Sequence, residues 1–362
     1  MVTGTMDRIP YIISKLALML CMCFAAAACT DEETAMQEEN RPQGTTAVSL
    51  MFNTRANEGD IDPNEGIKTL RIIVTDEAGT ILYNQKESGL GDVERRTVSI
   101  ELPKTKVRFY VFANEESMGR EFDTEGLEQD GLLAEGKLTS GNILGMAWTD
   151  TERAHFPKLA TDESIAQFGL PMTGCRGVQA HDTYKDDGIP VDLTNKTVEQ
   201  IEIPLVRCVI KIVVDITNAK IGDEYLDINA VNFGRFFPDK VYYYMHSNRT
   251  MPQGTNVTYH DFDLEPSVSI PQGEERTVCT VYTYPVTLPN SGDVYRYSIG
   301  LNDERDYKVF LTKNGERGNT YIPRNSRLVI KGTMSGTLTI NWTDLYLVVC
   351  FWEDKNMDIT FE

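Results

Sequence analysis

Hydrophobic and polar residues alternate along several stretches of this chain. In residues 206–216 one face carries Val206, Cys208, Ile210, Ile212, Val214 and Ile216, and the other carries Arg207, Lys211 and Asp215. A period of two residues is typical of an antiparallel strand with one face buried and the other in water. We therefore expect a half-buried strand here, with Ile210, Ile212 and Val214 in the core.

The same pattern predicts further strands. In residues 48–54 the apolar positions are Val48, Leu50 and Phe52. Two more runs, at 70–76 and 107–113, are rich in β-branched and aromatic residues, and Gly, Pro, Asn and Asp separate the runs. Short helices are expected only at 126–136 and 161–168. Many short strands with turn signals between them predict an all-β fold built from sandwiches.

The length of 362 residues suits two domains, because domains usually hold about 100–200 residues each. A polar stretch at 176–199 precedes the long strand at 206–216. We therefore place a boundary near residue 200 and expect consecutive domains at 56–202 and 203–362.

The segment 345–362 is strand-like throughout. Leu345, Leu347, Val349 and Phe351 share one face, and after a polar break Met357, Ile359 and Phe361 alternate with polar residues. Chain termini are normally frayed and polar, so a patterned terminal strand needs a partner. The partner is either the segment's own domain, as for an ordinary final strand, or another molecule.

The first thirty residues carry an export signal. Arg8 and Lys15 precede a short apolar run at 16–28, which ends in alanines directly before Cys29. A basic segment, an apolar segment and small residues mark a secretory signal peptide, and a cysteine at the cut marks a lipoprotein. The run is shorter than the roughly 20 apolar residues that span a bilayer. We expect removal of residues 1–28 and lipid on Cys29; a plain signal peptide followed by a chance cysteine is the alternative.

The chain is strongly acidic, with a formal net charge of −19 at pH 7. This charge repels nucleic acid and anionic lipid, so we expect no nucleic-acid partner. Residues 30–44 are polar and acidic without periodicity, which predicts a flexible tether between the lipid and the fold.

Four cysteines follow Cys29 without forming a CxxC pair. They are Cys175, Cys208, Cys279 and Cys350. Exported proteins can form disulfides, but two of these cysteines lie in apolar strand-like runs, where a thiol behaves as a small hydrophobe. We expect buried thiols in place of a disulfide framework.

No catalytic or metal-binding motif stands out. The four histidines are too far apart for a local metal motif. Residues 59–66 resemble the start of a calcium loop, but Arg71 stands at the twelfth position, where a bidentate Glu is needed. Phosphate-binding, dinucleotide-binding and nucleophile-elbow motifs are absent. The sequence therefore indicates no cofactor and no enzyme.

Aromatic residues leave a second interpretation open. Trp148 and the run Tyr242, Tyr243 and Tyr244 are candidates for an exposed platform that binds glycan in a surface lipoprotein of a nutrient-uptake system. The alternative, which we favour, is that they are strand and core aromatics.

The order of segments along the chain resembles the Bacteroidales fimbrillins, the FimA-type fimbrial subunits. The segments after the signal and the acidic tether are GIKTLRIIVTDEAGTILYNQ (66–85), VRFYVFANEE (107–116), PMTG (171–174), IPLVRCVIKIVVDITN (203–218) and NTYIPRNSRLVIKGTM (319–334). The resemblance covers almost the whole chain after Cys29. It implies two consecutive transthyretin-like antiparallel β-sandwiches and a fimbrial subunit that supports adhesion.

The resemblance also implies a mechanism. The lipidated precursor reaches the outer membrane, and a trypsin-like protease cuts after an Arg and removes the first strand with the lipid. A strand from another subunit then fills the groove. The matching cleavage position here is Arg55, with Arg41 as the weaker candidate, which makes 29–55 the tether and removable strand.

Within this scheme, the removable strand carries Val48, Leu50 and Phe52. The expected donor is the C-terminal strand with Met357, Ile359 and Phe361. Expected partners are other fimbrial subunits, the protease, and a host or bacterial surface ligand. A tip or anchor subunit shares this architecture and stays an alternative to a stalk subunit.

Overall fold

The structure is a computed structural model of the whole chain. It describes residues 44–54, 63–144, 146–149, 159–160, 162–180, 186–222, 225–244, 252–288, 297–300, 306–309, 320–322, 324–334 and 347–351. The candidate residues outside these ranges are Cys29, Arg41, Arg55, Met357, Ile359 and Phe361.

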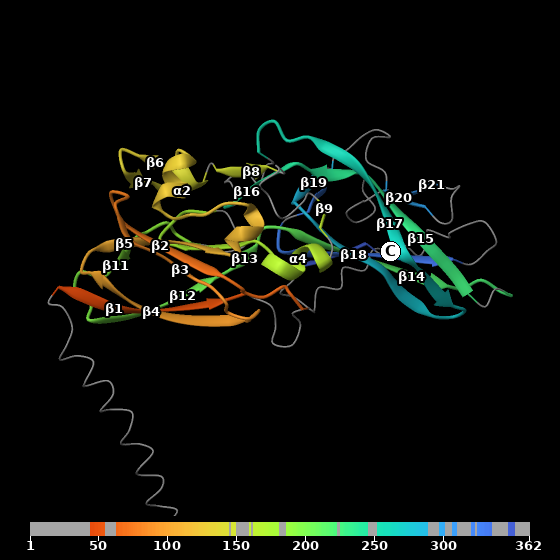
Figure 1. Cartoon of the computed structure of the whole chain (residues 1–362), viewed down its shortest axis with the longest axis horizontal. Helices are drawn as coiled ribbons and strands as arrows, with labels where there is room; N and C mark the ends of the chain where they lie inside the picture. The colour runs from red at the N-terminus through yellow and green to blue at the C-terminus, as the bar shows by residue number, and fades with distance from the viewer. Residues whose placement is uncertain are drawn as a thin grey trace, which may run out of the picture.

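Two sheets make up the first part of the described fold (Figure 1). The smaller sheet has the order β12–β1–β4, with β1 at Thr45–Asn53, β4 at Arg95–Pro103 and β12 at Val198–Pro204. The larger sheet has the order β13–β10–β5–β2–β3, with β11 beside β5. Its strands are β2 (Leu70–Asp76), β3 (Ile81–Glu87), β5 (Lys106–Ala113), β10 (Met172–Arg176), β11 (Val191–Asp192) and β13 (Val206–Arg207). Inward residues of both sheets share one hydrophobic core, so the sheets form a sandwich.

A five-stranded sheet, β24–β23–β14–β18–β9, dominates the second part. Its strands are β9 (Leu159–Ala160), β14 (Ile210–Asn218), β18 (Glu275–Thr283), β23 (Ser326–Met334) and β24 (Leu347–Phe351). A long two-stranded ribbon joins β15 (Tyr225–Pro238) and β17 (Val257–Pro271).

Shorter strands pair in twos. The pairs are β6 (Leu133–Ala134) with β7 (Lys137–Leu138), β8 (Ala147–Thr149) with β16 (Lys240–Tyr242), β19 (Val286–Leu288) with β22 (Thr320–Ile322), and β20 (Tyr297–Gly300) with β21 (Asp306–Val309).

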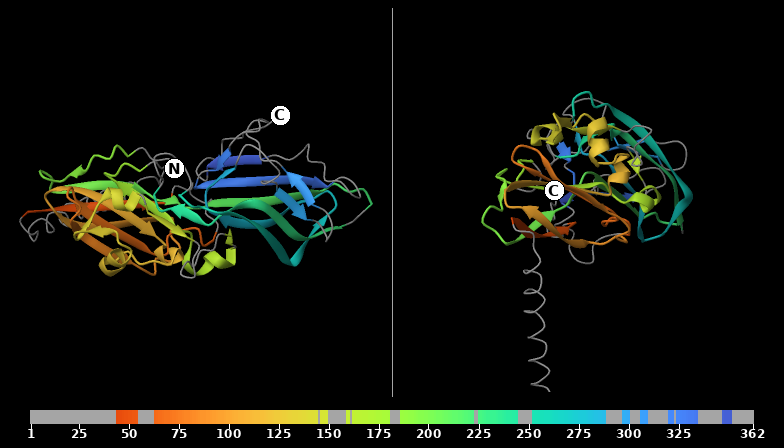
Figure 2. Two further views of the ribbon diagram at one scale, coloured as in Figure 1. Left: turned by 90° about the horizontal axis from the view of Figure 1, so that it is seen from above. Right: turned by 60° about the vertical axis from the view of Figure 1, so that its left-hand side comes forward.

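The two parts lie end to end along the long axis of the molecule (Figure 2). The strands of the first part run from orange to green, and most strands of the second part are teal or blue. The chain passes from the first part to the second between β13 and β14. Two short strands tie the parts together, because β8 pairs with β16 and β9 pairs with β18. We call this meeting region the junction.

Helices are few and short in the described residues. They are η1 (Glu115–Met118), α2 (Thr124–Gln129), α3 (Ser140–Leu144) and α4 (Asp162–Phe168). The expected helix at 161–168 matches α4, and the expected all-β fold is confirmed.

The expected helix at 126–136 is wrong in its bounds. Asp123 caps α2 by accepting a hydrogen bond from the Gly126 amide at 2.7 Å, so the helix begins two residues earlier. Gly131, with a φ of 67°, reverses the chain after α2. Residues 133–138 then form the β6–β7 hairpin.

The strand predicted at 206–216 is divided into β13 and β14. Ile210, Ile212 and Val214 are buried, as predicted. The expectation of a solvated opposite face is wrong for Arg207 and Lys211, which are also buried. The structure provides them with a buried carboxylate, described below.

Candidate functional site

β1 occupies the centre of the three-stranded sheet (Figure 1). It runs parallel to β12, from Ala47 opposite Val198 to Asn53 opposite Pro204. It runs antiparallel to β4, from Thr45 opposite Pro103 to Asn53 opposite Arg95. The strand predicted to be removable is therefore hydrogen-bonded along both of its edges.

The inward face of β1 is part of the core. Val48, Leu50 and Phe52 are each at most 1% exposed, whereas Met51 on the outer face is 41% exposed. Leu50 lies between Val98 of β4 and Ile201 of β12. β4 and β12 thus form the walls of a groove that the side chains of β1 fill.

Both ends of β1 are also fixed. The Thr46 hydroxyl donates a hydrogen bond to the Lys196 carbonyl at 2.7 Å. At the other end, the Leu205 amide donates to the Asn53 carbonyl at 2.8 Å, and the Thr54 amide donates to the Glu94 carbonyl at 3.1 Å. These contacts hold the strand in one register.

Loss of β1 would leave a gap one strand wide between β4 and β12. Their facing edges would lose their backbone partners, and the apolar walls would meet water. The chain connects β1 to β2 through residues 54–69, so one cut just after β1 separates this strand from everything that follows it. Such a groove accepts an added strand, which restores both the hydrogen bonds and the apolar packing.

A buried cluster of charges, which the sequence patterns did not reveal, lies beside the end of β1. The carboxylate of Glu65 accepts hydrogen bonds from Lys211 Nζ and from the Tyr282 hydroxyl, both at 2.8 Å. Arg207 lies 3.8 Å from the same carboxylate and donates to the Thr54 carbonyl at 3.5 Å. We call Glu65, Arg207, Lys211 and Tyr282 the junction cluster. It links the segment after β1 to β14 and β18.

The structure describes part of the expected donor segment. Residues 347–351 form β24, which pairs antiparallel with β23 of its own sheet. Residues 347–351 therefore form an ordinary edge strand of their own domain, which was one of the two interpretations of 345–362. Met357, Ile359 and Phe361 lie outside the described residues, and so do Cys29 and Arg55.

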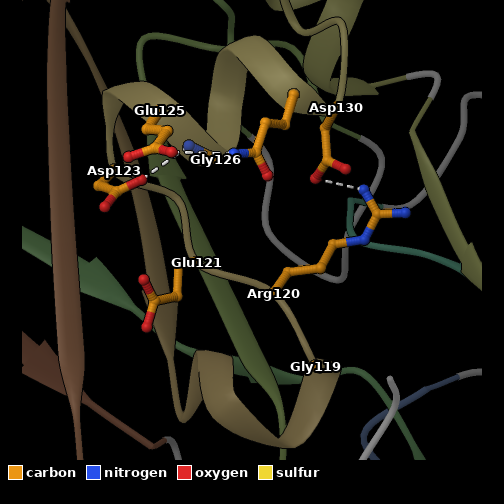
Figure 3. A pocket seen from close by; sticks show the side chains of 8 residues that line it. Gly119, Arg120, Glu121, Asp123, Glu125, Gly126 and Asp130 are labelled. Carbon is orange, nitrogen blue, oxygen red and sulfur yellow. Dashed lines mark hydrogen bonds and ion pairs between the residues drawn. The ribbon is translucent and has the colours of Figure 1, made fainter. Parts of the chain in front are cut away.

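A polar cavity of about 280 Å³ lies next to α2 (Figure 3). It is lined by Gly119, Arg120, Glu121, Asp123, Glu125, Gly126, Gln129 and Asp130. Asp123 is already used as the cap of α2, and Asp130 pairs with Arg120 at 2.5 Å. In the described part of the chain, no group of three His, Cys, Asp or Glu side chains is placed to hold a metal ion.

The aromatic run at 242–244 belongs mainly to the core. Tyr243 and Tyr244 are fully buried, and the Tyr244 hydroxyl lies 3.2 Å from the carbonyl oxygens of both Val111 and Gly174, so its one proton is shared between them. Tyr242 is half-buried in β16. Tyr243 and Tyr244 are therefore core residues, as we favoured from the sequence, and they cannot form an exposed platform for glycan.

Cys175, Cys208 and Cys279 are free thiols, whereas the side chain of Cys350 lies outside the described part of the structure. Cys208 and Cys279 are buried, and Cys175 is half-buried. Burial, together with the nearby Asp215 carboxylate, raises the pKa of the Cys279 thiol to about 12. The expectation of buried thiols holds for Cys208 and Cys279.

Comparison with known structures identifies fimbrial proteins as structural neighbours. The tip fimbrial protein Mfa3 of Porphyromonas gingivalis, with a C-terminal truncation, matches with a TM-score of 0.54 and 12% identity, over 85% of this chain and 100% of that one. A fimbrial assembly protein of Parabacteroides distasonis matches with a TM-score of 0.41 and 13% identity, over 84% of this chain and 99% of that one. A fimbrilin of Porphyromonas gingivalis matches with a TM-score of 0.42 and 12% identity, over 80% of this chain and 90% of that one.

Comparison of the sequence with family models and with curated proteins gave no match. At 12% identity the similarity to Mfa3 establishes a shared fold, which agrees with the expected all-β sandwich architecture.

Proposed function

We propose that the protein is a structural subunit of a cell-surface fimbria that polymerises by strand exchange and supports adhesion. The observation that carries the proposal is the position of β1, a buried central strand that one cut just after it would release. The shared fold with a tip fimbrial protein supports it. No catalytic role and no cofactor enter this function.

The proposed cleavage site is Arg55, which directly follows Thr54. The residues after it, ANEGDIDPNEG (56–66), are rich in Gly, Pro, Asn and Asp, a composition typical of exposed loops where proteases cut. Arg41 lies before β1, so cleavage there would leave β1 in its groove. A trypsin-like protease at Arg55 is therefore the proposed processing partner.

The precursor is proposed to be a lipoprotein of the outer membrane, anchored through Cys29. No described helix has the length and apolar character of a membrane-spanning segment. Cleavage at Arg55 would free the folded part from its lipid, so the mature subunit belongs to the extracellular fimbria. Labelling with a palmitate analogue should mark the wild type and leave Cys29→Ala unmarked.

The proposed donor is the tail that follows β24, with Met357, Ile359 and Phe361. Each such side chain contributes roughly 1.5–3 kcal/mol when it is buried in a groove. Donation from one subunit to the next is a head-to-tail contact that does not close, so it produces a filament. Uncut subunits should stay monomeric because β1 occupies the groove.

The proposal is tested by trypsin treatment of the purified precursor, followed by size analysis. Cleavage after Arg55 should produce ladders of oligomers, while Arg55→Ala should stay monomeric. Arg41→Ala is the matched control and should polymerise like the wild type. If the precursor stays monomeric after complete cleavage at Arg55, the proposed polymerisation is wrong.

A tip or anchor subunit is the second candidate. Between β5 and β10 the chain makes a long excursion that carries η1, α2, β6, β7, α3, β8, β9 and α4. Loops of this kind suit recognition of a host or bacterial surface ligand. A variant that lacks 357–362 distinguishes the roles, because a stalk subunit loses polymerisation without its donor and a tip subunit still accepts a strand from its neighbour.

A further inference from the structure

Residues 240–244, which we call the strap, belong to the second part by sequence but lie in the core of the first. The strap is on the connection between β15 and β17 and contains β16. β16 pairs with β8, which belongs to the excursion between β5 and β10 of the first part (Figure 1). Val241, Tyr243 and Tyr244 are members of the same hydrophobic core as the buried residues of β1 and β5. The second part therefore completes the core of the first.

The two buried rings of the strap pack against aromatic side chains of the first part. Tyr244 meets Tyr110 and Phe112 of β5 edge to face, with ring centroids 6.4 and 5.7 Å apart. Tyr243 meets Phe112 at 6.0 Å and Phe122 at 5.3 Å, also edge to face. Such pairs stabilise a core beyond the area that they bury. Withdrawal of the strap would leave a cavity bounded by the rings of Tyr110, Phe112 and Phe122.

The Tyr244 hydroxyl bonds to the backbone of two strands of the larger sheet. The Val111 amide donates to this hydroxyl at 3.2 Å, and the hydroxyl lies 3.2 Å from the Val111 and Gly174 carbonyl oxygens. Val111 and Gly174 stand opposite each other in β5 and β10. Because a buried backbone group that loses its partner destabilises the fold, the strap cannot leave the first part without a cost to both strands.

The backbone at Tyr243 is held from both parts of the fold. Its amide donates to the Met146 carbonyl at 3.2 Å, and its carbonyl accepts from Thr173 Oγ1 at 2.7 Å; both partners belong to the first part. The same carbonyl accepts from the Arg324 guanidinium at 2.6 Å, and Arg324 lies just before β23 of the second part. Thr173 and Arg324 are buried. The two parts therefore share one buried hydrogen-bond network at the strap.

We propose that the strap couples the two parts, so that they open only together. Domains of one chain usually move relative to each other unless a large hydrophobic interface joins them. Here the first part cannot open without releasing Tyr243 and Tyr244 from its core. The coupling does not depend on the proposed function. One consequence does rest on it: the strap contacts the larger sheet, so it would hold the first part together while β1 is absent from the smaller sheet.

Hydrogen exchange of the uncut full chain tests the coupling, with the slowest amides of β5 and β14 reporting on the two parts. Leu102→Ala weakens the first part directly, since Leu102 is buried in β4. In the wild-type background we expect this substitution to accelerate exchange in β5 and in β14 by the same factor, about 30-fold or more. Acceleration in β5 alone would show that the parts already open separately and would overturn the proposal. Strand exchange plays no part in either outcome.

A variant with Tyr243→Ala and Tyr244→Ala together assigns the coupling to the strap. In this background Leu102→Ala should accelerate exchange in β5 and leave β14 unchanged. Tyr242→Ala is the matched control, because Tyr242 lies on the same strap but is only half-buried, and it should keep the shared response. If Leu102→Ala still accelerates both strands equally without the two rings, other contacts of the junction couple the parts and the proposal is wrong. Should the double variant not fold, Tyr244→Leu takes its place, since it keeps an apolar side chain but loses the hydroxyl bonds and ring contacts, and the same two outcomes decide.

Discussion

Glu65 and Lys211 form a buried ion pair across the junction, with 2.8 Å between Oε1 and Nζ. Glu65 precedes β2 in the first part of the fold, and Lys211 belongs to β14 in the second. The Tyr282 hydroxyl from β18 donates to the same oxygen. The pair therefore joins the segment just after β1 to the second sheet, independently of β1 itself.

Glu65→Ala should destabilise the protein by about 3–5 kcal/mol, because it leaves Lys211 and Arg207 buried without their carboxylate. Chemical denaturation measures the loss. Glu274→Ala is the control, since its pair with Arg276 is about half exposed and should contribute about 0.5 kcal/mol or less. Equal effects of the two substitutions would contradict the role given to the junction cluster.

Leu50→Ala should cost about 2–5 kcal/mol in the uncut protein, because it opens a cavity between β4 and β12. Met51→Ala is a matched control one residue along the same strand, and its change should stay within about 0.5 kcal/mol because Met51 faces solvent. Thermal unfolding of both variants checks the contrast. Similar melting temperatures would mean that β1 contributes little to the core.

The sequence predicted what depends on local pattern. Alternation at 48–54 predicted β1 and its buried face, and alternation at 206–216 predicted the burial of Ile210 and Ile212. The same alternation was misleading for Lys211, because its partner Glu65 stands 146 residues away in sequence. Burial of a charge depends on such a distant partner, which no period reveals.

For the candidate groove, too, the sequence predicted one part and could not predict the other. The pattern identified the strand that fills it, but its walls come from β4 and β12, the latter about 150 residues further along the chain. The parallel pairing with β12, and with it the direction of the groove, follows from topology alone. The alternation of apolar and polar residues predicts which face of a strand is buried, but it does not predict which strands pair with it.

Cys279 should react far more slowly than a free thiol. Its pKa is raised to about 12 from an ordinary value of 9.0, mainly by burial and also by Asp215. The folded state therefore holds the proton more tightly than the unfolded state does. The stability that this provides is complete below about pH 9 and is lost as the pH rises toward 12.

At pH 8.5, iodoacetamide should modify Cys279 in the folded protein on the order of 100-fold more slowly than in urea. Mass spectrometry of peptides measures both rates. The half-buried Cys175 serves as the internal comparison and should be protected less. Rapid folded-state labelling of Cys279 would show that its strand opens easily.

Trypsin should stop at Arg55 because the next basic residue, Lys68, is held in place. The Lys68 amide donates to Asn114 Oδ1 at 2.8 Å, and its Nζ donates to Asn64 Oδ1 at 2.8 Å. Asn114 is buried and also donates from Nδ2 to the Gly66 and Leu170 carbonyls, at 3.0 and 2.7 Å. None of these bonds involves β1, so the segment should stay ordered after β1 has left.

Asn114→Ala removes the side-chain hydrogen bonds that join Asn114 to the Lys68 amide and to the Gly66 and Leu170 carbonyls. It should destabilise the protein by about 2–4 kcal/mol, because these backbone groups lose their partners. In this variant trypsin should continue past Arg55 to Lys68, which a shift in the N-terminal residue of the product reveals. Asn142→Ala is the control, since Asn142 donates one comparable bond, to the Leu132 carbonyl at 2.7 Å, elsewhere in the fold. If Asn114→Ala still yields a product that begins at Ala56, then other contacts hold Lys68 and the groove keeps its shape without Asn114.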